Sequence, residues 1–561
     1  MNELKNYLFR MRWFLVSVAA LTLMTHGSVL FTQRFGIDTD AIMNGIHNYD
    51  LIGRQGLIWL AKLLGLDLNW FNLYYAQVLT VLLLFLSPVA FACLFRLTVG
   101  EEKGEGAALL VLSVSYMVSP FWVSQIYFLN QSAQILLACI LTAAAIVLTE
   151  NARKDLRHRW YFLFFALLLM QATFSCYQVL IMIYITGVCT VFLLYSLRHG
   201  PSFRQQLGWI GFHAGIFTAG FLIDMAISNL FFMEGGHYLS EQIAWTRVTV
   251  PEGLRRCMEA IVLSLKNTPP YYTGLYGVFC LLFLALLLCH LTVRRAMKVP
   301  ADNLSECPPA FGKGSCILTM LSALFLCGSP YVFVFLYGGE LLDRMQLVMP
   351  LSQGCVLYLT VLLLTYAQPL QGRIFSAVKK GLLLLLVLAV CKDTLSHLSF
   401  CHRFYYTDEW VFQYTSRIAE EICQEIRTVQ YDNAAGKLPE SARDNILFLG
   451  YPVIPYNNTC LGGHVIGHSA FNYDLTVRQP ARERILLFLQ NMGYPVSARF
   501  TEEETVVFRQ YFESVFADTI DSMPSYPSPG YVQWISDKES GQGYLVIKLG
   551  DDWRRQASGD E

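Results

Sequence analysis

Two aspartates near the start of the chain, Asp38 and Asp40, have the residue type and spacing of a reacting pair. They lie in TQRFGIDTDAIMNGIHNYDLIGRQG, residues 32–56, which separates two long hydrophobic runs. At a membrane–water boundary, one carboxylate can take the proton of an acceptor hydroxyl while the other orients that hydroxyl or binds a metal. Alternatively, both are solvated, or they cap a helix that begins at Ala41.

The same segment ends in Gly53-Arg54-Gln55-Gly56. An arginine held between glycines can clamp a phosphate through paired N–H groups. The alternative is that Arg54 extends its side chain to a lipid headgroup. The elements on either side of the segment have to position both the aspartates and the arginine.

The composition indicates that these elements cross a membrane. Of 561 residues, 54% are hydrophobic and 15% are charged, whereas a soluble domain has about 25% charged residues. The net charge of −1 gives nucleic-acid binding no support. Most of the fifteen cysteines lie inside apolar runs, where they behave as small hydrophobic residues and not as a disulfide framework.

The apolar runs predict about eleven transmembrane helices, since a span needs about 20 apolar residues. A polar stretch, Ser175 to Gln178, divides one nearly continuous run into two of these helices. The predicted spans are 13–31, 73–97, 105–125, 131–150, 159–175, 178–197, 208–232, 273–293, 315–337, 346–367 and 376–397.

The loop charges predict the orientation. One set of loops holds eighteen Lys and Arg residues and the opposite set holds eight. Because cytoplasmic loops carry the excess of positive charge, we expect a cytoplasmic N-terminus and two large outer loops, 32–72 and 233–271. A short apolar stretch at 51–64 predicts an interfacial helix within the first of them. With an odd number of spans, the C-terminal tail lies outside as well.

Polar side chains gather at the outer ends of the predicted helices. They can line a cavity for sugar hydroxyls and phosphate, or they can merely satisfy the open backbone groups of the helix ends. The set that we assign to substrate binding, with Arg54, consists of Gln125, Tyr127, Tyr177, Gln178, Glu340 and Arg344, and Asn130, Gln131 and Asp343 lie beside them in the sequence.

Residues 401–561 have the composition of an ordinary globular domain. Strands are predicted at 446–450, 531–535 and 544–549, and helices at 407–428 and 480–492, the latter stopped by Gly493. Thr501 and Glu504 form a capping box for a further helix. We therefore expect a transmembrane domain over residues 1–400, followed by an extracytoplasmic α/β domain.

Two other features are candidates for function. Asp224 lies within a predicted span, where a carboxylate is costly and is a functional candidate by default, although it can also pair with a neighbouring helix. His464 and His468 are four residues apart, but Gly462, Gly463 and Gly467 argue against a helix there, and no third ligand is evident. We expect no metal site.

The segment FGIDTDAIMNGIHNYDLIGRQGL resembles the Gtr-type bacterial membrane glucosyltransferases, which modify O-antigen and related surface polysaccharides. TFSCYQVLIMIYITGV (173–188) and DRMQLVMPL (343–351) are similar to two later elements of that family. The resemblance covers about residues 1–400. Gln55 stands where the family more often has an aromatic residue, so the GR-x-G match is imperfect.

This resemblance implies a GT-C fold and a sugar, glucose by the family name, carried on polyprenyl phosphate. The acceptor would be a cell-envelope glycan such as O-antigen or teichoic acid, and a donor synthase and a flippase would supply the donor. Carried over to this sequence, the catalytic acidic residue is Asp38 or Asp40, and Arg54 or Arg344 contacts phosphate. No cofactor is implied, and a divalent metal requirement stays open.

Two rival functions remain. A glycan polymerase or ligase shares many spans and polar outer loops, but takes an oligosaccharide on a diphosphate. A flippase or transporter needs ionisable residues deep in several helices, whereas the polar residues here gather at the outer face. An enzyme of the cell membrane therefore fits the sequence better.

Overall fold

The computed structural model describes residues 11–32, 34–36, 38–47, 49, 52–99, 105–231, 243–266, 274–296, 312–366, 373–432, 446–463, 466–472, 482–494, 514–536 and 543–554. The chain forms two compact units. The first comprises Met1–Thr32, Asn48–Leu68 and Asn72–His402, and the second comprises Gln33–His47, Asn69–Phe71 and Arg403–Glu561. The segment with Asp38 and Asp40 thus belongs to the unit that contains the C-terminal residues.

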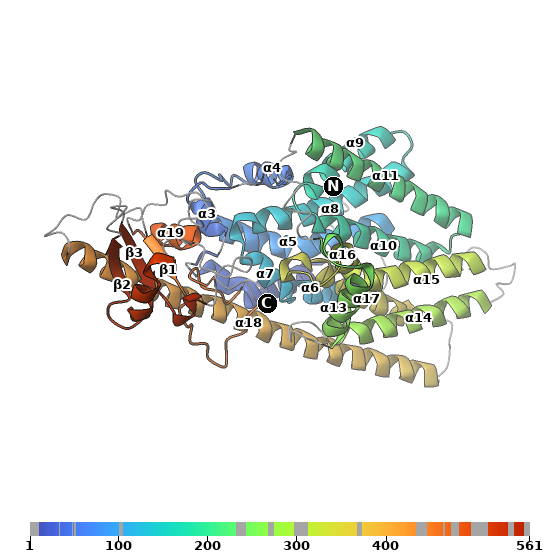
Figure 1. Ribbon diagram of the computed structural model, residues 1–561. Coiled ribbons are helices and arrows are strands. Elements are labelled where there is room, and N and C mark those ends of the chain that lie inside the picture. The colour runs from blue at the N-terminus through green and yellow to red at the C-terminus, as the bar shows by residue number, and fades with distance from the viewer. Residues whose placement is uncertain are drawn as a thin grey trace. The chain divides into compact units, whose positions relative to one another are not determined.

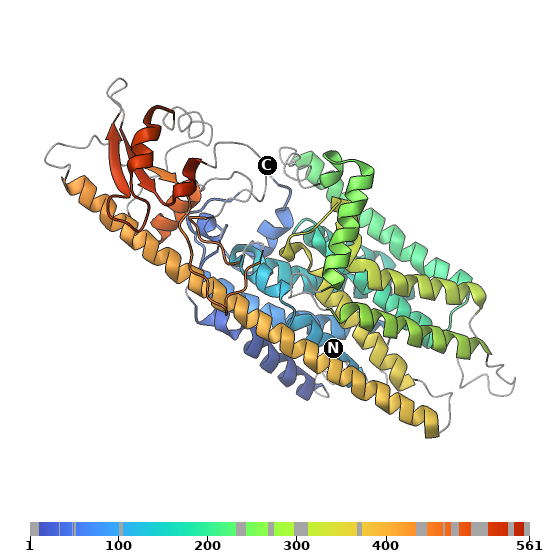
Figure 2. The same cartoon turned by 60° about the horizontal axis from the view of Figure 1, so that its bottom comes forward.

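The first unit is a bundle of helices that run roughly side by side (Figures 1 and 2). Its α-helices, in chain order, are α2 (Arg12–His26), α4 (Gln55–Leu63), α5 (Leu73–Val99), α6 (Glu105–Met117), α7 (Phe121–Ile126), α8 (Leu129–Lys154), α9 (Arg159–Phe174), α10 (Val179–His199), α11 (Phe203–Phe231), α13 (Val250–Leu265), α14 (Tyr276–Ala296), α15 (Lys313–Gly328), α16 (Val332–Tyr337), α17 (Val348–Tyr366) and the first part of α18 (Arg373–Asp432). Short 3-10 turns are η1 (Gly27–Leu30), η3 (Ala244–Thr246), η5 (Ser329–Tyr331) and η6 (Asp343–Met345).

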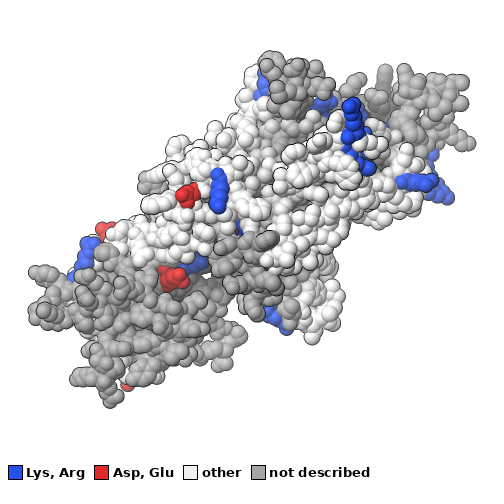
Figure 3. Space-filling view, turned by 90° about the horizontal axis from the view of Figure 1, so that it is seen from above, with Lys and Arg blue, Asp and Glu red and all other residues white. Residues whose placement is uncertain are grey.

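Nine helices within the described residues are long and apolar enough to cross a membrane, and two shorter apolar ones, Glu105–Met117 and Arg159–Phe174, lie at the third and fifth predicted spans. Large apolar side chains on the outside of the bundle are exposed, among them Trp160 (79%) and Leu281 (70%). Figure 3 shows a broad surface with few charged side chains. Apolar surface of this extent is rare on soluble monomers, so the helices favour a polytopic membrane protein.

One predicted span ends early in the structure, and one predicted division between two spans is confirmed. The span expected over 105–125 stops at Met117, because Pro120 lacks an N–H group and disfavours helical geometry in the residue before it. The polar stretch from Ser175 to Gln178 does separate two helices, as predicted, since α9 ends at Phe174 and α10 begins at Val179.

The boundary near residue 400 is not a break in the secondary structure. A separate span and a helix over 407–428 were expected, but α18 is one 60-residue helix from Arg373 to Asp432. After Gly381 this stretch contains neither glycine nor proline, so no residue in it ends the helix. The helix changes instead from an apolar to an amphipathic pattern.

The second unit contains a three-stranded sheet of order β1-β3-β2. The strands are β1 (Ile446–Leu449), β2 (Val532–Ser536) and β3 (Gly543–Lys548), each shifted by no more than one residue from its predicted position. β3 is parallel to β1 and antiparallel to β2.

Both faces of this sheet are covered. Ile446 and Phe448 pack with α18 and with α19 (Arg482–Asn491), whereas Leu447 and Leu449 pack with Ile520 and its neighbours. The alternation follows from the two-residue period of a strand. Gly493 has a φ of +83° just after α19, which confirms it as the stop of this helix. The capping box at Thr501 and Glu504 lies outside the described residues.

Candidate functional site

The aspartate segment forms one turn of helix in the second unit, α3 (Thr39–Met43). Asp38 precedes this turn with a φ of +68°, a left-handed conformation that is uncommon outside glycine. Its side chain makes no capping hydrogen bond, so capping does not explain this residue. The Asp40 carboxylate instead accepts a hydrogen bond from the Ala41 N–H at 2.8 Å.

One arginine of the C-terminal residues faces both carboxylates. Arg484 of α19 donates from Nη2 to Asp38 Oδ1 at 2.9 Å, and its Nη1 lies 3.6 Å from Asp40 Oδ1. The Asp38 side chain is 38% exposed and that of Asp40 is 3% exposed. The two aspartates therefore share a cation but differ in their exposure at the surface of the unit.

Burial sets the acidity of Asp40. It raises the pKa of this carboxyl from 3.8 to about 6, and the nearby Arg484 opposes the rise. The charge of Asp40 therefore changes with pH close to neutrality, where a solvated aspartate stays ionised.

The residues just before the aspartates anchor the segment. Arg34 is buried and lies 2.7 Å from the Asp408 carboxylate of α18. Phe35 packs against Phe412 and Phe488, with ring centroids 5.2 and 5.4 Å away. Contacts from α18 and α19 thus hold the aspartate segment within the second unit.

Arg54 is positioned by the glycines around it. Gly53 has a φ of +74°, which an L-residue rarely adopts, and so lets the chain turn into α4. A Cβ on Gly56 would lie 2.3 Å from the Ala172 carbonyl oxygen and 2.6 Å from Ser175 Oγ, so only glycine lets α4 approach the end of α9 this closely. The short α4 lies within the segment predicted as an interfacial helix.

Three predicted residues, Arg54, Tyr177 and Arg344, meet in the first unit. Arg54 Nη1 donates to Gln131 Oε1 at 3.3 Å, and its guanidinium lies 5.2 Å from the centre of the Tyr177 ring. The Tyr177 hydroxyl donates to the Arg344 carbonyl oxygen at 3.3 Å, and the Arg344 guanidinium lies 4.2 Å from the Phe128 ring centre. We call Arg54, Phe128, Gln131, Tyr177 and Arg344 the arginine cluster.

Gln125 and Tyr127 lie on and just after α7, next to Phe128 in sequence. Gln125 is fully buried, and among the described residues neither atom of its side-chain amide has a hydrogen-bond partner. The same is true of Gln55 beside Arg54. Buried amides normally find partners, so these two are candidates for contacts with a ligand.

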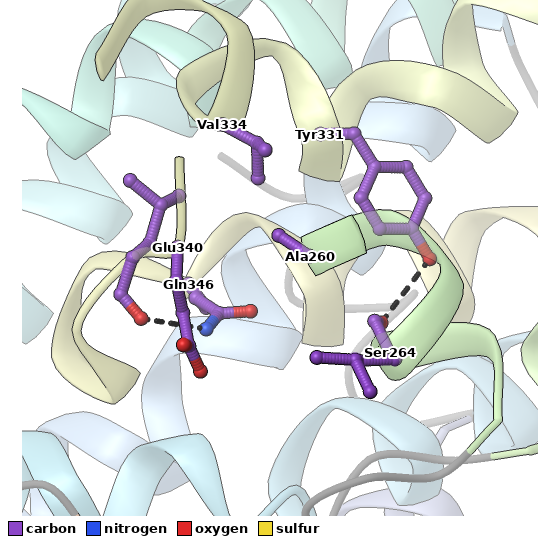
Figure 4. Close-up of a pocket in the computed structure, with 8 residues that line it drawn as sticks. Ala260, Ser264, Tyr331, Val334, Glu340 and Gln346 are labelled. Carbon is purple, nitrogen blue, oxygen red and sulfur yellow. Dashed lines mark hydrogen bonds between the residues drawn. The ribbon is translucent and has the colours of Figure 1, made fainter. Parts of the chain in front are cut away.

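Gln178 and Glu340 lie apart from these contacts. The Gln178 side chain is exposed and accepts a long hydrogen bond, 3.5 Å, from the Tyr337 hydroxyl. Glu340 lines a small cavity with Ser264, Tyr331 and Gln346 (Figure 4). Its volume is about 10 Å³, roughly the room that one water molecule needs, so it is too small for a sugar.

The remaining candidates have simple environments. Asp224 of α11 is half-buried and accepts a hydrogen bond from Gln171 Nε2 of α9 at 3.0 Å, which is the helix pairing considered above. His464 lies outside the described residues. Within the described residues, no group of three His, Cys, Asp or Glu side chains could hold a metal ion.

Sequence reasoning missed Arg484 and Phe128 and did not commit to Gln131. Arg484 lies 446 residues from Asp38, and its pairing leaves no local pattern. The positions of Phe128 and Gln131 did carry a signal, because Gln131 was noted as a neighbour of the candidate residues and Phe128 lies within the same stretch, 125–131.

A helical bundle with nine candidate spans among the described residues is typical of a polytopic membrane protein, and half-buried Arg54 and Arg344 lie against aromatic rings within it. The sequence profile described as Glucosyl transferase GtrII matches residues 27–342, which is more than half of the 561-residue chain. The chain therefore belongs to this family of glucosyl transferases, and the resemblance noted in the segment with Asp38, Asp40 and Arg54 is confirmed. Searches of curated proteins and of solved structures return no match.

Proposed function

We propose that this protein transfers a sugar, glucose in our proposal, from polyprenyl phosphate to a hydroxyl of a cell-envelope glycan on the extracytoplasmic side of the cell membrane. The family and the candidate spans support a membrane glycosyltransferase. The observation that carries the finer proposal is the arginine cluster, in which two guanidinium groups stack on aromatic rings.

Arg54 and Arg344 are proposed to hold the donor phosphate. Among the described residues Arg54 has no carboxylate partner and keeps donor groups beyond the one bonded to Gln131. An aromatic face orients a guanidinium while leaving its edge for an anion. Gln55 and Gln125, with unsatisfied buried amides, are proposed to bind sugar hydroxyls.

Asp38 is proposed as the general base because its side chain is the more exposed of the pair. The acceptor oxygen attacks the anomeric carbon as its proton passes to the Asp38 carboxylate, and the bond from that carbon to the phosphate oxygen breaks. Polyprenyl phosphate leaves with the electron pair, and the arginines stabilise its charge. The reaction inverts the anomeric configuration.

The decisive experiment compares purified full-length wild type with Asp38→Asn and Asp40→Asn in liposomes that contain polyprenyl phosphate [14C]glucose and an envelope-glycan acceptor. We expect each substitution to lower transfer by about 10²–10⁴-fold. Asp155→Asn serves as a control, because Asp155 is a partly exposed acid between α8 and α9.

Wild-type rates in both Asp38→Asn and Asp40→Asn would show that the mechanism is wrong. Transfer only from an oligosaccharide diphosphate would identify a polymerase or ligase instead. Movement of the donor across the bilayer without transfer would identify a flippase.

A further inference from the structure

Arg484 occupies a place in the second unit that neither the family match nor the sequence pattern assigns. It lies beyond residues 27–342, which the family profile covers. Yet its guanidinium is the group that spans the two aspartates, 2.9 Å from Asp38 and 3.6 Å from Asp40.

We propose that Arg484 is a positioning residue for sugar transfer, which holds Asp38 and Asp40 at a fixed spacing and balances their negative charge. The inference rests on the proposed function, since it assigns Arg484 a role only if this pair carries the chemistry. It gives the C-terminal residues a part in the reaction that acts through the two aspartates.

Two nitrogen atoms of one rigid guanidinium face one oxygen of each carboxylate. A planar guanidinium presents its donors in a fixed geometry, which lysine does not reproduce. This contact constrains Asp38 even though its backbone adopts a left-handed conformation, which is strained for a residue other than glycine.

A second residue of α19 supports the same segment. Asn491 Nδ2 donates to the Asp40 carbonyl oxygen at 2.9 Å. Asn44 Nδ2 lies 2.9 Å from both the same carbonyl oxygen and Asn491 Oδ1. Buried Ile485 and Leu489 fix α19 in the core of the unit. The helix thus contacts the backbone of the aspartate segment as well as its side chains.

The charged groups that act on Asp40 are Arg484 from α19 and Asp38 from its own segment, whereas Glu483 of α19 is exposed. Since Arg484 lowers the pKa of Asp40 against the effect of burial, its removal should raise that pKa further. In the proposed pair, ionised Asp40 orients the acceptor hydroxyl while Asp38 takes its proton, so activity falls when Asp40 is protonated. We therefore expect the acid limb of the pH–rate profile to move up by about one pH unit or more.

The test measures pH–rate profiles of full-length Arg484→Gln and Arg484→Lys in the liposome assay, with Arg417→Gln as a control on an exposed arginine of α18. We expect Arg484→Gln to lower kcat by about 10²-fold and to shift the acid limb upward, with an unchanged KM for the donor. Arg484→Lys should return the acid limb of the pH–rate profile to its wild-type pH and should restore only part of kcat. Normalised profiles of both variants that superimpose on the wild type would overturn the inference.

A second measurement decides the case if Arg484→Gln is inactive. Thermal unfolding at pH 7.5 is compared for Arg484→Gln in the wild-type background and in an Asp38→Asn/Asp40→Asn background. If Arg484→Gln lowers the melting temperature only in the wild-type background, the result supports an interaction of Arg484 with the two aspartates. An equal decrease in melting temperature in both backgrounds overturns the inference. If the aspartate variants are fully active, the proposed function fails, whatever the coupling between these residues.

Discussion

Arg54 owes its position to Gly53 and Gly56, and its orientation to the Tyr177 ring. The first glycine supplies a left-handed turn and the second supplies room for α4 against α9. The two glycines of the GR-x-G element therefore position the Arg54 guanidinium, and Gln55, the residue at x, is buried beside it. This explains physically why the element holds an arginine between two glycines.

Replacing Arg54 with lysine tests this placement. Lys keeps the charge but loses the planar group that stacks on Tyr177 and can bind phosphate through two N–H groups. We expect the KM for the polyprenyl-phosphate donor to rise about tenfold, which is the loss of roughly one charge-assisted hydrogen bond. Arg255→Lys on the exposed face of α13 is the control. Unchanged steady-state kinetics in Arg54→Lys would remove this arginine from the donor site.

The acidity of Asp40 predicts a stability effect with a definite sign. Burial raises its pKa from 3.8 to about 6, so the folded protein binds this proton more tightly than the unfolded chain. The associated stabilisation is fully present below about pH 4 and is lost as the pH rises through about 6.

Asp40→Asn should therefore be more stable than the wild type at pH 8, by at most about 3 kcal/mol. The advantage should disappear by pH 4. Melting temperatures across this range provide the measurement. In Asp155, a hydrogen bond from His158 lowers the pKa of the carboxyl, so Asp155→Asn should not show the gain. A difference for Asp40→Asn that is independent of pH would contradict the prediction.

At the scale of elements, α4 depends on its close contact with the end of α9. Leu57, Leu60 and Ala61 bury one side of the helix, and Gly56 permits the approach. Nine residues are too few to form a stable helix alone, so packing against the longer helices has to stabilise it. A change at the contact should therefore displace Arg54 and Gln55 together.

Gly56→Ala tests this contact. Its Cβ would meet the Ala172 carbonyl, Ser175 Oγ and the Cys176 nitrogen at 2.3–2.7 Å. We expect a loss of about 1–3 kcal/mol in stability, together with reduced transfer. Gly211→Ala on α11 is a matched control, since a Cβ there meets no atom within 4 Å. Equal melting temperatures for the two variants would show that α4 can move without cost.

At the scale of the whole molecule, the aspartate segment belongs to a unit formed mainly by residues that follow 402, although it precedes most of the bundle in sequence. The loop charges predict that the N-terminus of the chain lies in the cytoplasm and that the C-terminus lies outside it. The chemistry proposed here requires the same orientation, because the acceptor is outside.

Reporter fusions test that orientation. A phosphatase fused after residue 561 should be active on intact cells, and a fluorescent protein that matures only in the cytoplasm should be dark at the same position. Fusions within the 155–158 turn between α8 and α9 should give the opposite result. A cytoplasmic C-terminus would separate the second unit from an external acceptor and contradict the proposed function.

The sequence by itself determined the membrane character, the positions of most helices and strands, and the family. These properties follow from local patterns: apolar runs of spanning length, two-residue alternation in the strands, and the GR-x-G element. It also indicated Arg54, Tyr177 and Arg344 as polar residues near predicted helix ends, and the structure places these three in contact.

Only the tertiary structure decided the partners. Arg484 meets Asp38 across 446 residues, and Pro120 ends a helix that hydropathy extends. Glu340 lines a small cavity to which the arginine cluster does not contribute. Hydropathy and spacing show whether a segment is suited to a membrane, a buried core or solvent. Which distant side chain contacts a given residue depends on how the helices pack, and packing is a property of the whole chain.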